Sequence, residues 1–326
     1  MHRLYSRATQ QFSSLETIGR AALSDDVVWI DMHDPTVPEK RELEKLLGYE
    51  LPTRDEMKDI EPSSRLYRED GVTYMTAVLV WKADTDVPEL ADVSFVLARN
   101  RLVTIRYSEP MAFRVFKTYA ERERTVLPSG AATLVTLLDC VVDRNAEILE
   151  QTALQVDSIS RDVFAEDNGP RAGRAGKNLA LALRQIAKRQ NLMAKTRESL
   201  VSLGRLSSFL MLAPEVNESA ELREQLKSFS RDISSLTDHA SFLMANISFL
   251  LDASLGLVNI EQNQIIKIFS VAAVIFLPPT LVASSYGMNF SHMPELRWLF
   301  GYPMAICLMM VSAVVPLLWF KRRGWL

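Results

Sequence analysis

The chain has 326 residues, of which 48% are apolar and 24% are charged, which is enough for one large or two ordinary domains with a buried core. Its 37 basic and 40 acidic residues give a net charge of −3, so nothing favours nucleic-acid binding. The two cysteines, Cys140 and Cys307, lie far apart, which excludes a disulfide scaffold and a cysteine-based zinc site. The N-terminal segment lacks an apolar core, so we expect no secretory signal peptide.

The N-terminal part of the chain alternates short strand-like and helix-like segments. Runs rich in β-branched and aromatic residues predict strands at 27–32, 72–81, 92–99 and 101–107. Apolar periodicity predicts helices at 38–48 and 111–124. We therefore expect residues 1–130 to form a cytoplasmic α/β or α+β domain, and the sequence does not decide between these two classes.

Helical periodicity dominates from residue 131 onward. We expect a helical hairpin over 131–220, with helices at 131–167 and 177–210. A third helix begins near Glu221 and carries an apolar seam with alternating steps of four and three residues: Leu222, Leu226, Phe229, Ile233, Leu236, Ala240, Leu243, Ile247, Leu250, Ser254 and Leu257. This seam is typical of a coiled coil, and equally of an amphipathic helix packed on its own domain. No proline interrupts the helix before Pro278, so a stalk over 221–286 would continue directly into the membrane.

Two long uncharged segments, Ile268–Tyr286 and Tyr302–Phe320, lie near the C-terminus. Each spans about 28 Å as a helix, close to the roughly 30 Å hydrocarbon core of a bilayer. We expect transmembrane spans at about 265–286 and at 301–320, joined by an outer loop over 287–300. The alternative is a buried helical hairpin of a soluble protein.

The charges that flank the two spans predict their orientation. Lys267 precedes the first span, and the basic tail at 321–326 follows the second. The positive-inside rule places both flanks in the cytoplasm. We therefore expect both termini to be cytoplasmic, with the lipid membrane as one partner of the chain.

No enzymatic motif is present. The four histidines form no zinc-binding pair, and the glycine-rich run at 169–178 departs from the phosphate-loop spacing at Arg171 and Asn178. The DMHD run at 31–34 resembles a metal site, but a strand end followed by a turn is the preferred interpretation. We therefore expect no enzyme and no cofactor.

The first span has a face suited to an ion pore. Five residues of this span fall within about 80° of one another on a helical wheel, and three of them carry hydroxyl groups: Ser270, Ala273, Leu277, Thr280 and Ser284. Because one chain with two spans cannot enclose a pore, several copies must form a symmetric ring.

The end of the first span offers neutral oxygen acceptors. Asn289 supplies a side-chain carbonyl, while Gly287 and Met288 supply backbone carbonyls at a helix end. Neutral acceptors of this kind suit a strongly hydrated cation, because they can accept hydrogen bonds from its water shell. Glu295, the only acidic residue of the outer loop, would concentrate cations at the pore mouth.

The run Tyr286-Gly287-Met288-Asn289-Phe290, followed by Met293-Pro294-Glu295-Leu296, resembles the CorA family of divalent-cation channels. The signature of that family is a Gly-Met-Asn tripeptide that closes the first of two C-terminal spans. The resemblance is strong over 246–326 and extends weakly to WIDMHDPT at 29–36. It implies a homo-oligomeric, pentameric funnel in the inner membrane. Mg²⁺ would be both its substrate and its regulatory ligand, with Co²⁺ and Ni²⁺ as secondary substrates.

The resemblance also implies roles for individual residues. The selectivity filter would be Gly287, Met288 and Asn289, and matching pore-lining positions are Asn263, Ile266, Phe269, Ala273, Leu277 and Thr280. Phe269 and Ser270 compete for one place on the pore face. Regulatory Mg²⁺ sites would lie between subunits, with Asp84 or Asp86 on the N-terminal domain and Asp232 or Asp238 on the long helix.

Two alternatives remain at this point. One is a zinc-specialised transporter of the same superfamily, the ZntB branch, which is expected to carry another central residue in the tripeptide than Met288. The other is a two-span membrane receptor or scaffold, which would need neither Asn289 nor a polar face on the first span.

Overall fold

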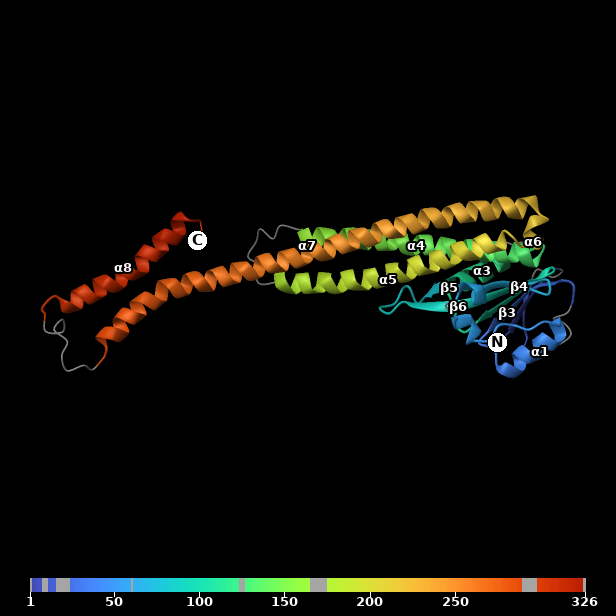
Figure 1. Ribbon diagram of the computed structural model, residues 1–326, viewed down its shortest axis with the longest axis horizontal. Coiled ribbons are helices and arrows are strands. Elements are labelled where there is room, and N and C mark those ends of the chain that lie inside the picture. Colours follow the sequence, from blue (N-terminus) through green and yellow to red (C-terminus); the bar gives the residue numbers. More distant parts are fainter. Residues whose placement is uncertain are drawn as a thin grey trace. The chain divides into compact units, whose positions relative to one another are not determined.

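The computed structural model describes residues 2–7, 11–15, 24–59, 61–122, 127–164, 175–288 and 298–324. The chain divides into two compact units, Met1–Leu251 and Asp252–Leu326. The first unit contains a sheet and most of the helices (Figure 1). The boundary lies inside the long helix α7 (Ala220–Tyr286), whereas the sequence divides the chain by composition near residues 130 and 220.

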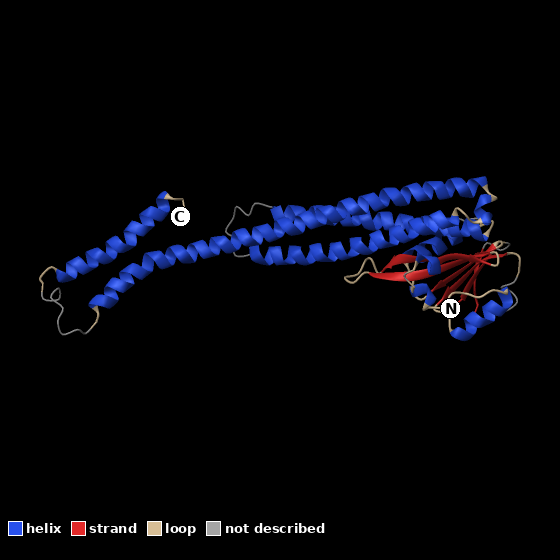
Figure 2. Cartoon of the chain, viewed as in Figure 1, coloured by secondary structure: helices blue, strands red, loops and turns tan. Residues whose placement is uncertain are grey.

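In the described residues, seven strands form one mixed sheet in the order β2-β1-β3-β7-β6-β5-β4. Figure 2 shows this sheet in red. All neighbouring strands are antiparallel except the central pair β3 and β7. The strands are β1 (His2–Ser6), β2 (Gln11–Leu15), β3 (Val27–His33), β4 (Leu66–Glu69), β5 (Val72–Trp81), β6 (Glu89–Ala98) and β7 (Arg101–Arg106). The four predicted strands correspond to β3, β5, β6 and β7. The other three have no counterpart in the prediction because they are short and carry few consecutive apolar residues.

Both faces of the sheet are covered. On one face, the core contains Leu43 of α1 (Val37–Leu47) and Met57 of the short helix η2 (Glu56–Lys58). The other face packs against α3 (Met111–Arg122), α4 (Gly130–Phe164) and α5 (Ala175–Leu210). Two one-turn helices, α2 (Pro62–Arg65) and α6 (Pro214–Asn217), complete the unit. The predicted fold class, a mixed domain followed by long helices, is confirmed.

A buried ion pair joins the two parallel strands at the centre of the sheet. The Asp31 and Arg106 side chains are 3% and 0% exposed, with an Arg106 Nη2 to Asp31 Oδ2 distance of 2.8 Å. Arg106 Nε and the Thr104 hydroxyl both donate to Asp31 Oδ1, and Trp29 Nε1 donates to Thr104. Strand β3 ends at His33, and Asp34 follows with φ of 52°. The DMHD run is therefore a strand end followed by a turn, which confirms the interpretation favoured from the sequence over a metal site.

The apolar seam of α7 packs on its own chain. Leu226, Phe229 and Ile233 share one core cluster with residues of α4 and α5. Four further seam residues share a second cluster with the same two helices: Ala240, Leu243, Ile247 and Leu250. Of the two interpretations left open by the seam, the structure therefore favours an amphipathic helix packed within its own unit.

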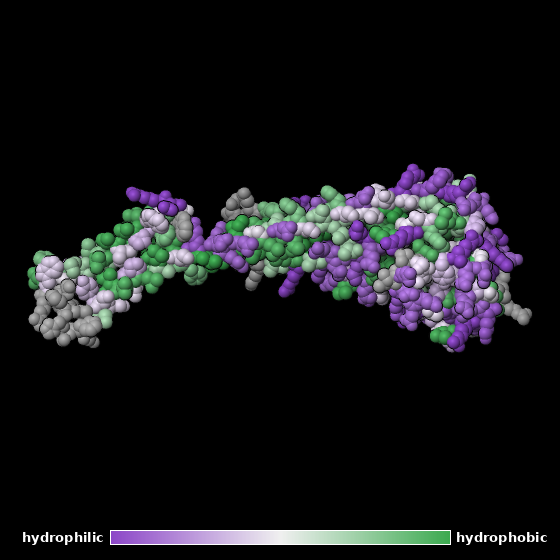
Figure 3. Space-filling model, viewed as in Figure 1, coloured by the Kyte–Doolittle hydropathy of each residue, from purple (hydrophilic) through white to green (hydrophobic). Residues whose placement is uncertain are grey.

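The second unit contains two apolar helical segments, the last part of α7 and α8 (Gly301–Arg322). Their apolar windows are only 6% and 11% buried. Helices of a buried soluble hairpin would be mostly covered, so that alternative is wrong. Hydrophobic surface is concentrated on these helices, whereas the surface of the first unit is largely hydrophilic (Figure 3). Pro278 and Pro279 lie inside α7, whose last part is curved (Figure 1).

Candidate ion pathway

All eight predicted pore-lining residues lie on the last part of α7, and each has an exposed side chain. They are Asn263, Ile266, Phe269, Ser270, Ala273, Leu277, Thr280 and Ser284. The Thr280 hydroxyl donates to the Phe276 carbonyl at 2.7 Å, which leaves its oxygen free to accept from water. The rest of the face exposes large apolar side chains such as Ile266 and Leu277.

The covered side of this segment is the opposite one. Val271 is buried, and Ile275 and Val282 are half-buried. On a helical wheel these three positions fall within about 20° of the direction opposite Ala273. Most of this segment is therefore uncovered, and the predicted pore face belongs to the uncovered part.

The helix ends where the tripeptide begins. Tyr286 is the last residue of α7, and the Gly287 amide donates to the Ala283 carbonyl at 2.9 Å. Gly287 and Met288 are exposed. Asn289 and Glu295 lie outside the described residues, so the selectivity filter and the acidic mouth remain predictions.

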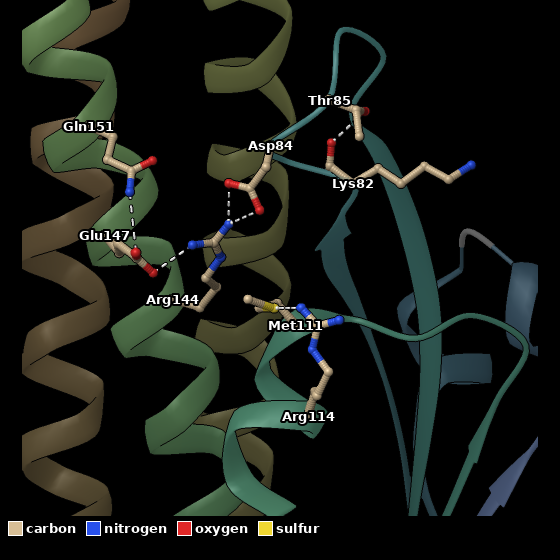
Figure 4. Close-up of polar contacts among 8 residues, drawn as sticks. All are labelled: Lys82, Asp84, Thr85, Met111, Arg114, Arg144, Glu147 and Gln151. Carbon is tan, nitrogen blue, oxygen red and sulfur yellow. Dashed lines mark hydrogen bonds and ion pairs between the residues drawn. The ribbon is translucent and has the colours of Figure 1, made fainter. Parts of the chain in front are cut away.

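Asp84 and Asp86, two of the predicted regulatory aspartates, are both paired with basic residues, and Figure 4 shows the pair that Asp84 forms. They lie on the connection between β5 and β6. Both Asp84 carboxylate oxygens accept from Arg144 Nη2 on α4 at 2.6 Å. Asp86 accepts from Lys188 Nζ on α5 at 2.7 Å, and this hydrogen bond lowers the pKa of Asp86. A divalent cation that bound either carboxylate would have to compete with these basic partners.

The two predicted aspartates on α7, Asp232 and Asp238, are exposed. Partial burial raises the pKa of Asp139 on α4 to about 6, and repulsion from Asp143 and Asp232 adds to this shift. Asp232 therefore belongs to an acidic neighbourhood on α4 and α7. Within the residues that the structure describes, no three acidic, histidine or cysteine side chains are placed to hold a metal ion. The regulatory ligands are thus not assembled in one chain.

Arg144 and Lys188 are the residues of this region that sequence reasoning missed. Arg144 lies 60 positions from Asp84, and Lys188 lies 102 from Asp86. Arg144 also pairs with Glu147, through Nη1 and Oε2 at 2.5 Å (Figure 4). Neither residue belongs to a motif, because only folding brings α4 and α5 beside the β5–β6 connection.

Comparison with known proteins identifies the family. Residues 24–322 match the model described as "CorA-like Mg2+ transporter protein". The Magnesium transport protein CorA of Yersinia pseudotuberculosis is 37% identical over 306 residues, covering 93% of this chain and 94% of that protein. The Magnesium transport protein CorA of Escherichia coli is 36% identical over 301 residues, covering 92% of this chain and 92% of that protein. The complete CorA structure from Methanocaldococcus jannaschii aligns with a TM-score of 0.76 at 20% identity, covering 100% of this chain and 99% of that one, and shows the same fold.

The resemblance carried by the Gly-Met-Asn run and the two terminal spans is therefore confirmed over nearly the whole chain. Two long, uncovered apolar helices and these relatives make it a membrane protein. The chain belongs to the CorA-like Mg²⁺ transporter family.

Proposed function

We propose that this chain forms a homo-oligomeric, pentameric channel that carries Mg²⁺ into the cell. The observation that supports it best is the uncovered face of α7 from Asn263 to Ser284, which runs directly into Gly287 and Met288. A single copy leaves this face open, and a symmetric ring of copies would close it around a pore. The relatives named as magnesium transport proteins support Mg²⁺ as the main substrate.

Selection in this proposal acts on the hydrated ion. A ring of Asn289 carboxamides, with the backbone carbonyls of Gly287 and Met288, accepts hydrogen bonds from the water shell of Mg²⁺. Ions of similar hydrated size, Co²⁺ and Ni²⁺, would follow as secondary substrates. The ring of Glu295 carboxylates concentrates cations at the entrance.

The proposed location is the inner membrane, with both termini in the cytoplasm. Lys321 and Arg322 lie in the last turn of α8, where positive charge is retained on the cytoplasmic side. The membrane potential then drives a divalent cation inward with about 4.6 kcal/mol per 100 mV.

Family membership also decides between classes of protein. The family consists of transporters, so the expectation that this chain is not an enzyme is confirmed. The two-span receptor and the zinc-specialised transporter are not favoured, because the relatives of 36–37% identity are named for magnesium transport.

Flux in proteoliposomes tests the proposal directly. Purified protein should carry Mg²⁺ down an inward potential, whereas empty liposomes should not. External hexammine complexes of Co³⁺ or Ru³⁺ should block this uptake competitively, because they match hexahydrated Mg²⁺ in size and cannot shed their ligands. Absence of Mg²⁺ flux would contradict the channel. If the hexammine complexes fail to block uptake at concentrations far above the half-saturating Mg²⁺ concentration, recognition of the hydrated ion is contradicted.

We further propose that cytoplasmic Mg²⁺ closes the channel by binding between neighbouring subunits. Asp84 or Asp86 of one subunit would face Asp232 or Asp238 of the next, and the ion would neutralise their charges. Without bound Mg²⁺, the Asp84 and Asp86 carboxylates form ion pairs with Arg144 and Lys188 of their own chain. Mg²⁺ would then have to displace a basic side chain to bind.

Combined replacement of Asp84, Asp86, Asp232 and Asp238 by asparagine should weaken inhibition by internal Mg²⁺. We expect the half-inhibitory concentration to rise about tenfold or more, equivalent to about 1.4 kcal/mol, because hard carboxylate ligands are lost. Protection of the protein from proteolysis by Mg²⁺ should disappear as well. Asp70→Asn is the matched control, since Asp70 is exposed at a turn with φ of 49°, a conformation that asparagine adopts well. Unchanged Mg²⁺ responses in the fourfold variant would show that the sensor lies elsewhere.

A further inference from the structure

A cavity of about 440 Å³ lies in the first unit, between α5 and the edge of the sheet. Its walls are formed by α5 from Ala194 to Arg205, by Arg65 and Leu66, and by Thr76 and Val78 of β5. The volume falls within the range of about 300–1,000 Å³ that is typical of small-molecule sites. None of its lining residues belongs to the predicted filter, pore face or regulatory pairs.

The cavity exists because the sheet ends early on this side. β4 pairs with β5 only from Val72 to Met75, whereas β5 continues to Trp81. In the described part of the chain, no strand flanks β5 beyond Met75 on the side of β4. Helix α5 lies there instead, and the Val78 amide donates to the Ser202 hydroxyl oxygen at 3.0 Å. This contact leaves the hydroxyl hydrogen of Ser202 able to donate to a ligand.

The charges in the cavity are mainly positive. Three lining residues are arginines, whereas Glu198 is the one acidic residue among those that line it. Asp92 orients the first arginine, Arg65, through its Nη2 at 3.0 Å. The other two, Arg197 and Arg205, are exposed and form no ion pair within the residues that the structure describes. Two unpaired cations at the rim of a cavity favour an anionic ligand.

The spacing of these two arginines favours a ligand with several linked anionic groups. Arg197 and Arg205 lie eight residues apart on α5, which separates them by about 12 Å along the helix axis. On a helical wheel they are about 80° apart, so both project from one side of the helix. A small anion can contact one guanidinium group at this spacing, whereas a chain of phosphates can reach both.

An open apolar hollow of about 540 Å³ continues from the cavity along α5. The cavity and the hollow share Leu66, Val201 and Arg205, so together they form one groove. Phe209 and Leu212 line the apolar part, and Leu212 is 73% exposed. A ligand that fits this groove therefore has an anionic chain at one end and a flat, largely apolar group at the other.

We propose that this groove binds a nucleoside polyphosphate, with the phosphates on Arg65, Arg197 and Arg205 and the base on Phe209 and Leu212. Guanidinium groups bind phosphate oxygens through paired, charge-assisted hydrogen bonds. An aromatic ring offers a stacking surface for a base. The site lies outside the proposed ion path and does not depend on transport, so it goes beyond the proposed function.

Titration calorimetry of the full-length protein in detergent tests the arginines, with ATP as the probe. EDTA is present, so that no Mg²⁺ joins the phosphates to the regulatory aspartates. We expect saturable binding by the parent, and a loss of affinity of about tenfold or more when Arg197 and Arg205 are both replaced by alanine. Arg184→Ala is the matched control and should bind like the parent, because Arg184 is exposed on the same helix and does not line the groove.

Glu198→Gln separates binding from folding. This variant removes the acidic side chain of the cavity, so it should bind ATP severalfold more tightly than the parent. ATP should also raise the melting temperature of the parent, because a ligand that binds only the folded state stabilises it. The double arginine variant should melt like the parent without ATP and should lose most of the rise that ATP causes.

Tripolyphosphate and adenosine test the two ends of the groove. Each should compete with ATP and bind more weakly than ATP does. Leu212→Ser should weaken the binding of ATP severalfold and leave that of tripolyphosphate unchanged, because only the base contacts Leu212. Tripolyphosphate that binds as tightly as ATP would overturn the placement of the base.

Absence of saturable ATP binding at millimolar concentrations would overturn the site. Equal losses of affinity in Arg184→Ala and in the double arginine variant would overturn it as well, because binding would then follow the overall charge of α5. Neither result affects the proposed channel, which is tested by Mg²⁺ flux. A parent protein that binds ATP through these arginines and carries no Mg²⁺ would contradict the channel alone.

Discussion

Replacement of Asn289 by alanine should abolish most Mg²⁺ uptake and leave assembly intact. A methyl group cannot accept hydrogen bonds from the water shell of the ion, and each lost bond to a charged partner costs about 1.5–3 kcal/mol. Because the change is repeated in every subunit, a decrease in uptake of about tenfold or more is expected. Assembly should persist, since the α7 residues that pack in the two core clusters lie between Leu226 and Leu250, well before Asn289 in the sequence.

The measurement is Mg²⁺ uptake into proteoliposomes, with the oligomeric mass determined in detergent on the same preparation. Asn217→Ala provides the control, because Asn217 is an exposed asparagine at the end of the short helix α6 in the first unit. Uptake by Asn289→Ala at the parental rate would contradict selection by the asparagine ring. Loss of uptake together with loss of the oligomer would instead assign Asn289 to assembly.

Replacement of Asp31 by asparagine should destabilise the first unit severely. Arg106 would keep its charge inside the sheet while losing the carboxylate that accepts from its Nε and Nη2. Breaking a buried pair from one side costs about 3–5 kcal/mol, because the remaining charge is left uncompensated. For a unit of this size, the apparent melting temperature should fall by about 6–20 °C. Thermal unfolding of the full-length protein in detergent measures this shift.

Two further variants make this test specific. Asp26→Asn removes a carboxylate from an exposed pair with Arg7, whose atoms are 3.7 Å apart, and should cost less than about 1 kcal/mol. The double variant Asp31→Leu with Arg106→Met removes both buried charges and should recover much of the loss. If Asp31→Asn melts like Asp26→Asn, the central ion pair contributes little to the stability of the sheet.

The sequence by itself determined the elements whose signal is local and long. Two uncharged apolar runs predict the spans, and periodicity predicts the helices that the structure shows as α4, α5 and α7. Helical spacing alone also places Ala273, Leu277 and Thr280 on one face of α7, and the role of that face as a pore lining stays a prediction. The family was recognisable for the same reason, since the Gly-Met-Asn run and the spans lie within one continuous segment.

The tertiary structure decided every feature that depends on residues far apart in the chain. Strands β1, β2 and β4 are short, and their places in the sheet depend on their pairing partners. The seam of α7 reads equally as a coiled coil or as a packed helix, and only the position of α4 and α5 against it distinguishes the two. Likewise, nothing in the sequence identifies the ion-pair partners of Asp31, Asp84 and Asp86. Their charges acquire partners only when folding brings Arg106, Arg144 and Lys188 within hydrogen-bond distance, because electrostatic contacts depend on distance in space and leave no periodic trace along the chain.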